Sequence, residues 1–205
     1  MYTKILLSAA AMAASIFTFG QAETSSKKMT YGFMLGSNYS NTIINGNLPN
    51  GTSSSGGIGF ELGVTGDLSL GKGFYWSPSA RLAFNNASIT FDNNDQTQTE
   101  YEVMKIALSF DAPFTFQIGQ GEWKPLLLAG PTVSIPLDQD DLPAEEFPTA
   151  TSYGVQVGIG CFKKLEHFSI APTLVYSYGL NNVNQNPRLS EVQFHQLSLQ
   201  VRITG

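Results

Sequence analysis

Two histidines, His167 and His195, are the only side chains in the sequence that could serve as an imidazole base in hydrolysis. Ser190 and Glu191 lie close to His195 along the chain, and a serine, a histidine and a carboxylate can together form a nucleophilic site. Serine and glutamate are also common in polar loops, so we interpret this group as a loop beside a strand histidine. The sequence predicts no catalytic residues, and a site centred on His195 is the alternative.

A cluster of carboxylates is the other group with potential chemistry. Oxygen ligands at this density could bind Ca²⁺, but no EF-hand spacing is present. We therefore expect no metal site and interpret the carboxylates as residues that keep a loop solvated. The cluster comprises Asp138, Asp140, Asp141, Glu145 and Glu146.

The composition excludes several other classes. A formal net charge of -5 disfavours nucleic-acid binding, because phosphate recognition needs a basic surface. The single cysteine, Cys161, cannot form an intramolecular disulfide, and we interpret it as a small apolar side chain rather than a nucleophile. Residues 53–57 are rich in serine and glycine but lack the lysine of a phosphate-binding loop, so no cofactor is expected.

Residues 1–22 have the pattern of a signal peptide. Lys4 gives a positive start, residues 5–19 form an uncharged apolar run, and Gly20 and Ala22 are small residues placed for signal peptidase. The run is short for a membrane-spanning helix, which needs about 20 residues. We predict export, cleavage after Ala22 and a single domain over residues 23–205.

The remaining sequence repeats an alternation of apolar with small or polar residues, the period of two that is typical of β-strands. Tyr101 and Val103 are out of phase with Ile106, which predicts a β-bulge near Lys105. The alternation predicts eight strands, over residues 30–39, 58–70, 74–91, 100–118, 123–137, 152–162, 168–178 and 191–204.

The connections between these strands alternate in length. Those at residues 71–73, 119–122 and 163–166 are short, whereas those at residues 40–56, 92–99, 138–151 and 179–190 are long and polar. Transmembrane barrels have short periplasmic turns and long outer loops. The predicted fold is all-β: an eight-stranded, antiparallel, up-and-down transmembrane β-barrel of the outer membrane. Its even strand number places both termini on the periplasmic side.

A soluble barrel would give the same alternation with the apolar face turned inward. The polar face is dominated by small residues, which suit the narrow lumen of eight strands but not a solvent-facing surface. Aromatic residues gather at the strand ends, as in the girdles of a membrane barrel. Those near the short connections are Phe33, Trp76, Phe114, Phe116, Trp123 and Phe168, and those near the long ones are Tyr39, Phe84, Tyr101, Tyr153, Tyr176 and Tyr178.

Three segments carry a family resemblance. Ala-Pro-Phe-Thr-Phe at residues 112–116, Lys-Pro-Leu-Leu-Leu-Ala-Gly-Pro at residues 124–131 and Tyr-Ser-Tyr-Gly-Leu-Asn-Asn at residues 176–182 resemble strands of PorT-like outer-membrane β-barrel proteins of Bacteroidota. The resemblance extends from about Thr30 to Ile203. It implies an eight-stranded outer-membrane barrel and little about activity, although PorT itself is associated with protein secretion and cell-surface assembly.

We therefore expect an integral outer-membrane barrel with a structural or accessory role, in secretion or cell-surface assembly. A narrow porin-like channel for small solutes and a lipid-modifying enzyme are the alternatives. The expected partners are outer-membrane lipids and lipopolysaccharide, whose divalent ions the acidic loop could share, together with unidentified envelope proteins.

Five charged residues are predicted to face the lumen. Arg81 is expected opposite Gly63, next to Glu61, with Asp111 at similar depth. Arg202 and Asp67 flank the first strand, where Gly32 offers no side chain to separate them. Because an unpaired buried charge is costly, we expect Arg81 to pair with Glu61 or Asp111, and Arg202 with Asp67. Such pairs predict a lumen without a continuous open channel.

Overall fold

The computed structural model describes residues 29–45, 53–92, 98–137, 149–184 and 191–205. The predicted signal peptide and the acidic cluster at residues 138–146 lie outside the described residues, as does Ser190. The described strands are β1 (Met29–Asn45), β2 (Ser53–Ser55), β3 (Gly57–Gly71), β4 (Phe74–Trp76), β5 (Ser79–Phe84), β6 (Ala87–Asp92), β7 (Gln98–Val103), β8 (Ile106–Asp111), β9 (Phe114–Gln117), β10 (Trp123–Pro136), β11 (Ser152–Lys164), β12 (Ser169–Gly179) and β13 (Glu191–Thr204).

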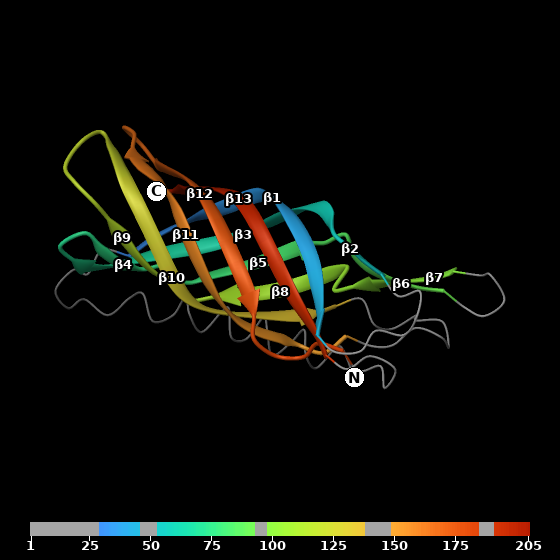
Figure 1. Cartoon of the computed structure of the whole chain (residues 1–205). Helices are drawn as coiled ribbons and strands as arrows, with labels where there is room; N and C mark the ends of the chain where they lie inside the picture. The colour runs from blue at the N-terminus through green and yellow to red at the C-terminus, as the bar shows by residue number, and fades with distance from the viewer. Residues whose placement is uncertain (1–28, 46–52, 93–97, 138–148, 185–190) are drawn as a thin grey trace, which may run out of the picture.

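The main sheet closes on itself. Its strands pair antiparallel with their neighbours, and β1 pairs with both β13 and β3, which completes the ring (Figure 1). β4 and β5 together occupy one place in this ring, and β8 and β9 occupy another. The ring therefore has eight places, and the predicted eight-stranded antiparallel barrel is confirmed. In the described part of the chain, no helix is long and apolar enough to cross a bilayer.

Two predicted strands are interrupted. The sequence predicted continuous strands over residues 74–91 and 100–118, but the first divides into β4, β5 and β6 and the second into β7, β8 and β9. Two of these breaks contain a proline, Pro78 and Pro113. Proline has no N–H to donate to a neighbouring strand, so the strand pairing is interrupted there. A Cβ on Gly130 would lie 2.4 Å from the Pro113 Cα, so only glycine fits opposite this break.

The predicted β-bulge near Lys105 is wrong, although the strand is interrupted there. Phe84 pairs with Ile106 and Ala87 with Val103, so neither strand has an extra residue, and Val103 faces inward like Ala107. Met104 separates β7 from β8 and has φ of 53°, and its carbonyl accepts a 2.7 Å hydrogen bond from the Asn85 side chain. Beyond this point β6 pairs with β7 on one side and with β2 on the other, forming a small sheet that projects past one end of the ring (Figure 1). Residues 40–56 were predicted as a loop, but β1 continues to Asn45 because β13 remains paired with it as far as Glu191.

The apolar face of the strands points outward. Phe33, Ile58 and Ile159 are 70%, 76% and 61% exposed, while the alternate residues are buried or partly buried. Cys161 is exposed on this outer face. Most of the predicted girdle aromatics are exposed there too, but Tyr101 is not, since its ring packs against an apolar cluster inside the barrel. A lipid-facing exterior is the outcome expected of a membrane barrel.

Candidate functional site: the barrel lumen

Arg81 lies at the centre of the lumen. It is on β5, in register with Gly63 of β3 on one side and Ser109 of β8 on the other, as the sequence predicted for Gly63. A Cβ on Gly63 would lie 2.8 Å from the Arg81 Cβ, so the glycine gives the arginine side chain room. The Arg81 side chain is only 1% exposed. A charge buried to this degree needs partners.

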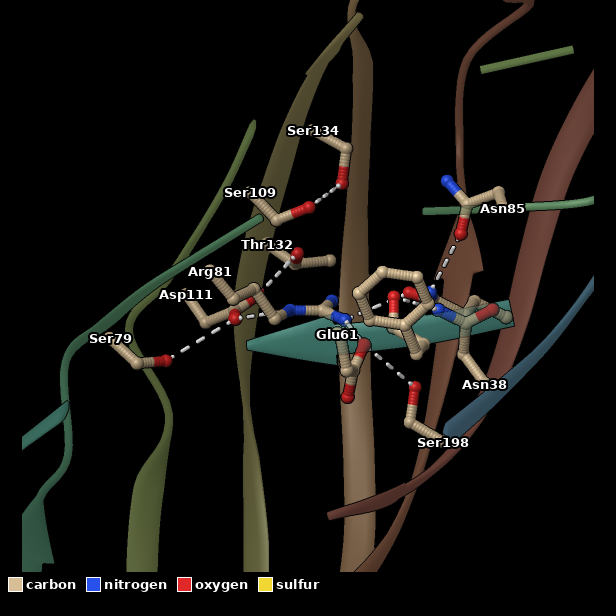
Figure 2. A network of polar contacts seen from close by, with 12 residues as sticks. Asn38, Glu61, Ser79, Arg81, Asn85, Ser109, Asp111, Thr132, Ser134 and Ser198 are labelled. Carbon is tan, nitrogen blue, oxygen red and sulfur yellow. Dashed lines mark hydrogen bonds and ion pairs between the residues drawn. The ribbon is translucent and has the colours of Figure 1, made fainter. Parts of the chain in front are cut away.

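Two carboxylates from neighbouring places in the ring contact Arg81. Its Nη1 lies 2.5 Å from Oε2 of Glu61 on β3, and its Nε lies 2.9 Å from Oδ2 of Asp111 on β8. Figure 2 shows the guanidinium between the two acids. The sequence predicted one partner or the other; the structure places both within ion-pair distance.

Neutral side chains complete the polar layer around these charges (Figure 2). Asp111 accepts hydrogen bonds from Thr132 at 2.6 Å and Ser79 at 3.3 Å, and Glu61 accepts one from Ser198 at 3.2 Å. Gln196 accepts from Arg81 at 2.9 Å and donates to Asn85 at 3.1 Å. Sequence reasoning did not single out Gln196 or Ser198, although their inward position on β13 follows from the alternation.

Arg202 and Asp67 form a separate and looser pair nearer the short turns. Arg202 Nη1 lies 3.5 Å from Asp67 Oδ1, at the upper limit for a hydrogen bond. The two residues are on β13 and β3, the neighbours of β1. The five lumen residues named from the sequence therefore come together in two groups, one of three and one of two.

A third layer lies at the end of the barrel with the long connections, and it is apolar. The sequence predicted small or polar residues facing inward, but the buried side chains at this end form a hydrophobic cluster. Val183, from the connection after β12, is fixed within it because its N–H donates to the Val192 carbonyl at 2.9 Å. The cluster consists of Ala87, Ile89, Val103, Met104, Ala107, Val183, Val192 and Phe194.

The sequence matches the family model described as "Outer membrane protein beta-barrel domain" over residues 19–185. The chain belongs to this family. It is an outer-membrane β-barrel protein, as its closed ring and apolar exterior also indicate.

Solved structures with a similar fold include other outer-membrane barrels. Neisserial surface protein A (NspA) is 17% identical, with 83% of this chain and 96% of that chain covered and a TM-score of 0.48. OprG from Pseudomonas aeruginosa is 14% identical, with 86% and 91% covered and a TM-score of 0.48. Ail of Yersinia pestis is 13% identical, with 87% and 99% covered and a TM-score of 0.43. A comparison with curated proteins found no significant match.

His195 of this outer-membrane barrel is packed between two tyrosines. Its Nδ1 lies 3.1 Å from the Tyr176 hydroxyl, and its ring centroid lies 4.6 Å from that of Tyr178. Within the described residues neither ring nitrogen contacts a carboxylate, and Glu191 instead accepts a hydrogen bond from Gln193. The described residues also contain no group of three side chains suited to a metal ion.

Proposed function

We propose that this outer-membrane barrel does not conduct solutes and has a structural or accessory role, in secretion or cell-surface assembly. The observation that carries the proposal is the burial of Arg81 between Glu61 and Asp111 in the middle of the lumen. Eight strands enclose a space just wide enough for side chains, so a fixed group there leaves little room for a water-filled path.

The apolar cluster at the long-connection end supports the same proposal. An ion crossing this layer would lose its hydration without gaining polar partners, which is costly. The polar layer and the apolar layer therefore obstruct the lumen at two depths by different physical means. A channel would need both layers to rearrange.

The orientation of the barrel also forms part of the proposal. Gly205 donates its N–H to the Tyr31 carbonyl at 3.1 Å, so the two ends of the barrel sequence meet at the end with the short turns. We assign this end to the periplasm and the sheet of β2, β6 and β7 to the outside. The exposed aromatic girdles would then contact outer-membrane lipids and lipopolysaccharide.

Within the outer-membrane barrel family, we propose that this chain is PorT-like, because residues 112–116, 124–131 and 176–182 resemble strands of PorT-like proteins. It favours a role in secretion or surface assembly over solute uptake. The packing of His195 against Tyr176 and Tyr178 gives no support to a lipid-modifying enzyme.

Planar-bilayer recording tests the sealed lumen. The purified mature barrel should give no steady conductance, while an open porin reconstituted in the same way serves as the positive control. Steady single-channel steps from the wild-type protein would contradict the proposal and favour the narrow-channel alternative.

Site-specific photo-crosslinking in the native membrane tests the accessory role. A crosslinker at Ser54, exposed on β2, should capture envelope proteins, whereas one at Val157, on the lipid-facing side of β11, should capture lipid only. The absence of protein adducts from Ser54 would count against a protein partner at this end.

A further inference from the structure

Three adjacent strands carry polar side chains on the outer face of the barrel. Near the long connections, several outward positions of β1, β13 and β12 have hydroxyl, amide or imidazole groups. They are Ser37, Tyr39, Asn41, Tyr176, Tyr178, Gln193 and His195. At the same end of β3 and β10, the exposed outward residues are Ile58, Phe60, Ile135 and Leu137. The polarity is therefore local to one part of the barrel wall.

The strand register brings four of these polar residues together. Asn41 of β1 is in register with His195 of β13, which is in register with Tyr178 of β12. Tyr176 lies two positions from Tyr178, on the same face of β12. The Tyr176 hydroxyl is 3.1 Å from His195 Nδ1, and the Tyr178 and His195 rings meet edge to face with centroids 4.6 Å apart. We name Asn41, Tyr176, Tyr178 and His195 the tyrosine patch.

His195 supports the two tyrosines of this patch from beneath. It is 5% exposed, whereas Tyr176 and Tyr178 are 40% and 39% exposed. The Tyr176 hydroxyl is held by the imidazole, while the Tyr178 hydroxyl makes no hydrogen bond within the described residues. A molecule beside the barrel would therefore meet two fixed aromatic rings and a hydroxyl that can still donate and accept.

Asn41 adds an amide donor at the edge of the patch. Its Oδ1 accepts the N–H of Thr42 at 2.9 Å, which fixes the carboxamide. Among the described residues its Nδ2 makes no hydrogen bond, and this atom is not buried. Tyr39 lies beside Asn41 on the same face of β1, and Gly56 gives its ring room, because a Cβ there would lie 2.6 Å from the Tyr39 hydroxyl.

The chemistry of the patch suits a sugar better than an ion. None of its four residues is an aspartate, glutamate, lysine or arginine, so it has no fixed charge for a phosphate or a metal ion. Sugars present hydroxyls, which exchange hydrogen bonds with amide and phenol groups. They also present C–H groups, which pack against aromatic rings.

The size of the patch also favours a small polar headgroup over a protein. The patch spans two interstrand spacings of about 4.8 Å and one two-residue step of about 7 Å. A stable protein interface needs about 800 Å² on each partner. The exposed residues around the patch include Leu180, Leu197 and Leu199, which are suited to hydrocarbon.

We propose that Asn41, Tyr176 and Tyr178 bind the sugar headgroup of a glycolipid in the outer leaflet, with His195 holding the two tyrosines in position. This rests on the orientation given under the proposed function, in which the long connections lie outside. It assigns the lipid contact of that end to particular residues and to one kind of headgroup. The patch is outside the lumen, so a barrel that conducts ions could still have it.

Native mass spectrometry tests the glycolipid site. The mature barrel is placed in nanodiscs of phosphatidylcholine that contain a neutral glycolipid, diglucosyl diacylglycerol, and the lipids that remain bound after release are measured. The wild-type barrel should retain the glycolipid in preference to phosphatidylcholine. Tyr178→Phe, which keeps the ring, and Asn41→Ala should each weaken this retention about two- to tenfold, the effect of losing one neutral hydrogen bond.

His195 requires variants of its own. His195→Ala should weaken glycolipid retention, because Tyr176 and Tyr178 lose their support. His195→Asn should restore most of it, since a side-chain amide can replace the imidazole in the contact with the Tyr176 hydroxyl. A loss that His195→Asn leaves unchanged would contradict this role of His195.

Tyr31→Phe is the matched control, and it should retain the glycolipid as the wild type does. Tyr31 is exposed on the outer face at the opposite end of the barrel. Both leaflets of the nanodisc contain the glycolipid, so Tyr31 meets the same headgroups. For the same reason, a negative result would count against the patch and not against the proposed orientation. Tyr178→Phe remains informative even if Asn41→Ala fails to fold.

Three results would overturn the proposal. One is a wild-type barrel that retains the glycolipid no better than phosphatidylcholine. Another is an equal loss in Tyr31→Phe and Tyr178→Phe, which would reflect a general preference of girdle tyrosines. The third is a pair of barrels without bound glycolipid that Tyr178→Phe separates, which would assign the patch to a second copy of this chain.

Discussion

Arg81 and Gln196 are 115 positions apart in the sequence, yet Arg81 Nη1 donates a 2.9 Å hydrogen bond to the Gln196 side chain. The two residues are on β5 and β13, which β3 and β1 separate in the ring, so the bond crosses the lumen rather than joining paired strands. Such a contact exists only once the barrel has closed. The polar layer around Arg81 is therefore complete only when the barrel has closed.

Replacing Arg81 with alanine should destabilise the barrel. The Arg81→Ala variant leaves Glu61 and Asp111 buried without their common cation, which typically costs about 3–5 kcal/mol. Urea-induced unfolding of the reconstituted barrel, followed by tryptophan fluorescence, measures the loss. Lys105→Ala is the control, since Lys105 forms an exposed pair with Glu102 that should contribute less than about 1 kcal/mol. Equal losses in the two variants would show that the Arg81 pairs are not effectively buried.

Gly130 should tolerate no side chain. In Gly130→Ala the new Cβ would meet the Pro113 backbone at 2.4 Å, and overpacking of this kind costs about 1–3 kcal/mol or prevents folding. The yield of the heat-modifiable band on an SDS gel reports the outcome. Gly121→Ala is the matched control, because the nearest atom to its Cβ lies at 3.5 Å. A normal folded band from Gly130→Ala would mean that β9 and β10 can separate at this break.

His195→Ala should leave envelope lipids unchanged. The ring contacts Tyr176 and Tyr178, and its removal is expected to cost about 0.5–1.5 kcal/mol of aromatic packing rather than an activity. Mass spectrometry of lipid A from cells with the wild-type or the variant gene provides the comparison. A lipid modification that disappears with His195, in cells where the variant barrel is still inserted, would revive the enzyme alternative.

The exported protein should begin at Glu23. Signal peptidase is expected to cut after Ala22, and the mature chain should fractionate with the outer membrane and migrate differently on SDS gels before and after boiling. Intact-mass measurement of the purified barrel locates the cleavage site. An uncleaved chain in the inner membrane would contradict the predicted signal peptide.

The alternation of residue types by itself determined the class of fold. Side chains on a strand point to opposite faces in turn, so a local pattern indicates which residues share a face without knowledge of the neighbouring strands. This was enough to place Glu61, Arg81 and Asp111 on the inner face. It misled at Val103, whose apolar side chain was read as a sign of a β-bulge but lies on the inward face in an unchanged register. Short turns also set the local register, so the pairing of Arg81 with Gly63 could be counted from the turn at residues 71–73.

Only the tertiary structure decided which side chains contact one another inside the ring. Whether Arg81 pairs with Glu61, Asp111 or both depends on distances across a closed barrel, and the same holds for its contact with Gln196. Ile89 continues the inward phase of Arg81 and Val103 that of Asp111, and Val183 from a distant connection joins them in the apolar cluster. Alternation is a property of one strand, whereas these contacts depend on the register of several strands and on barrel closure, so only the folded chain specifies them.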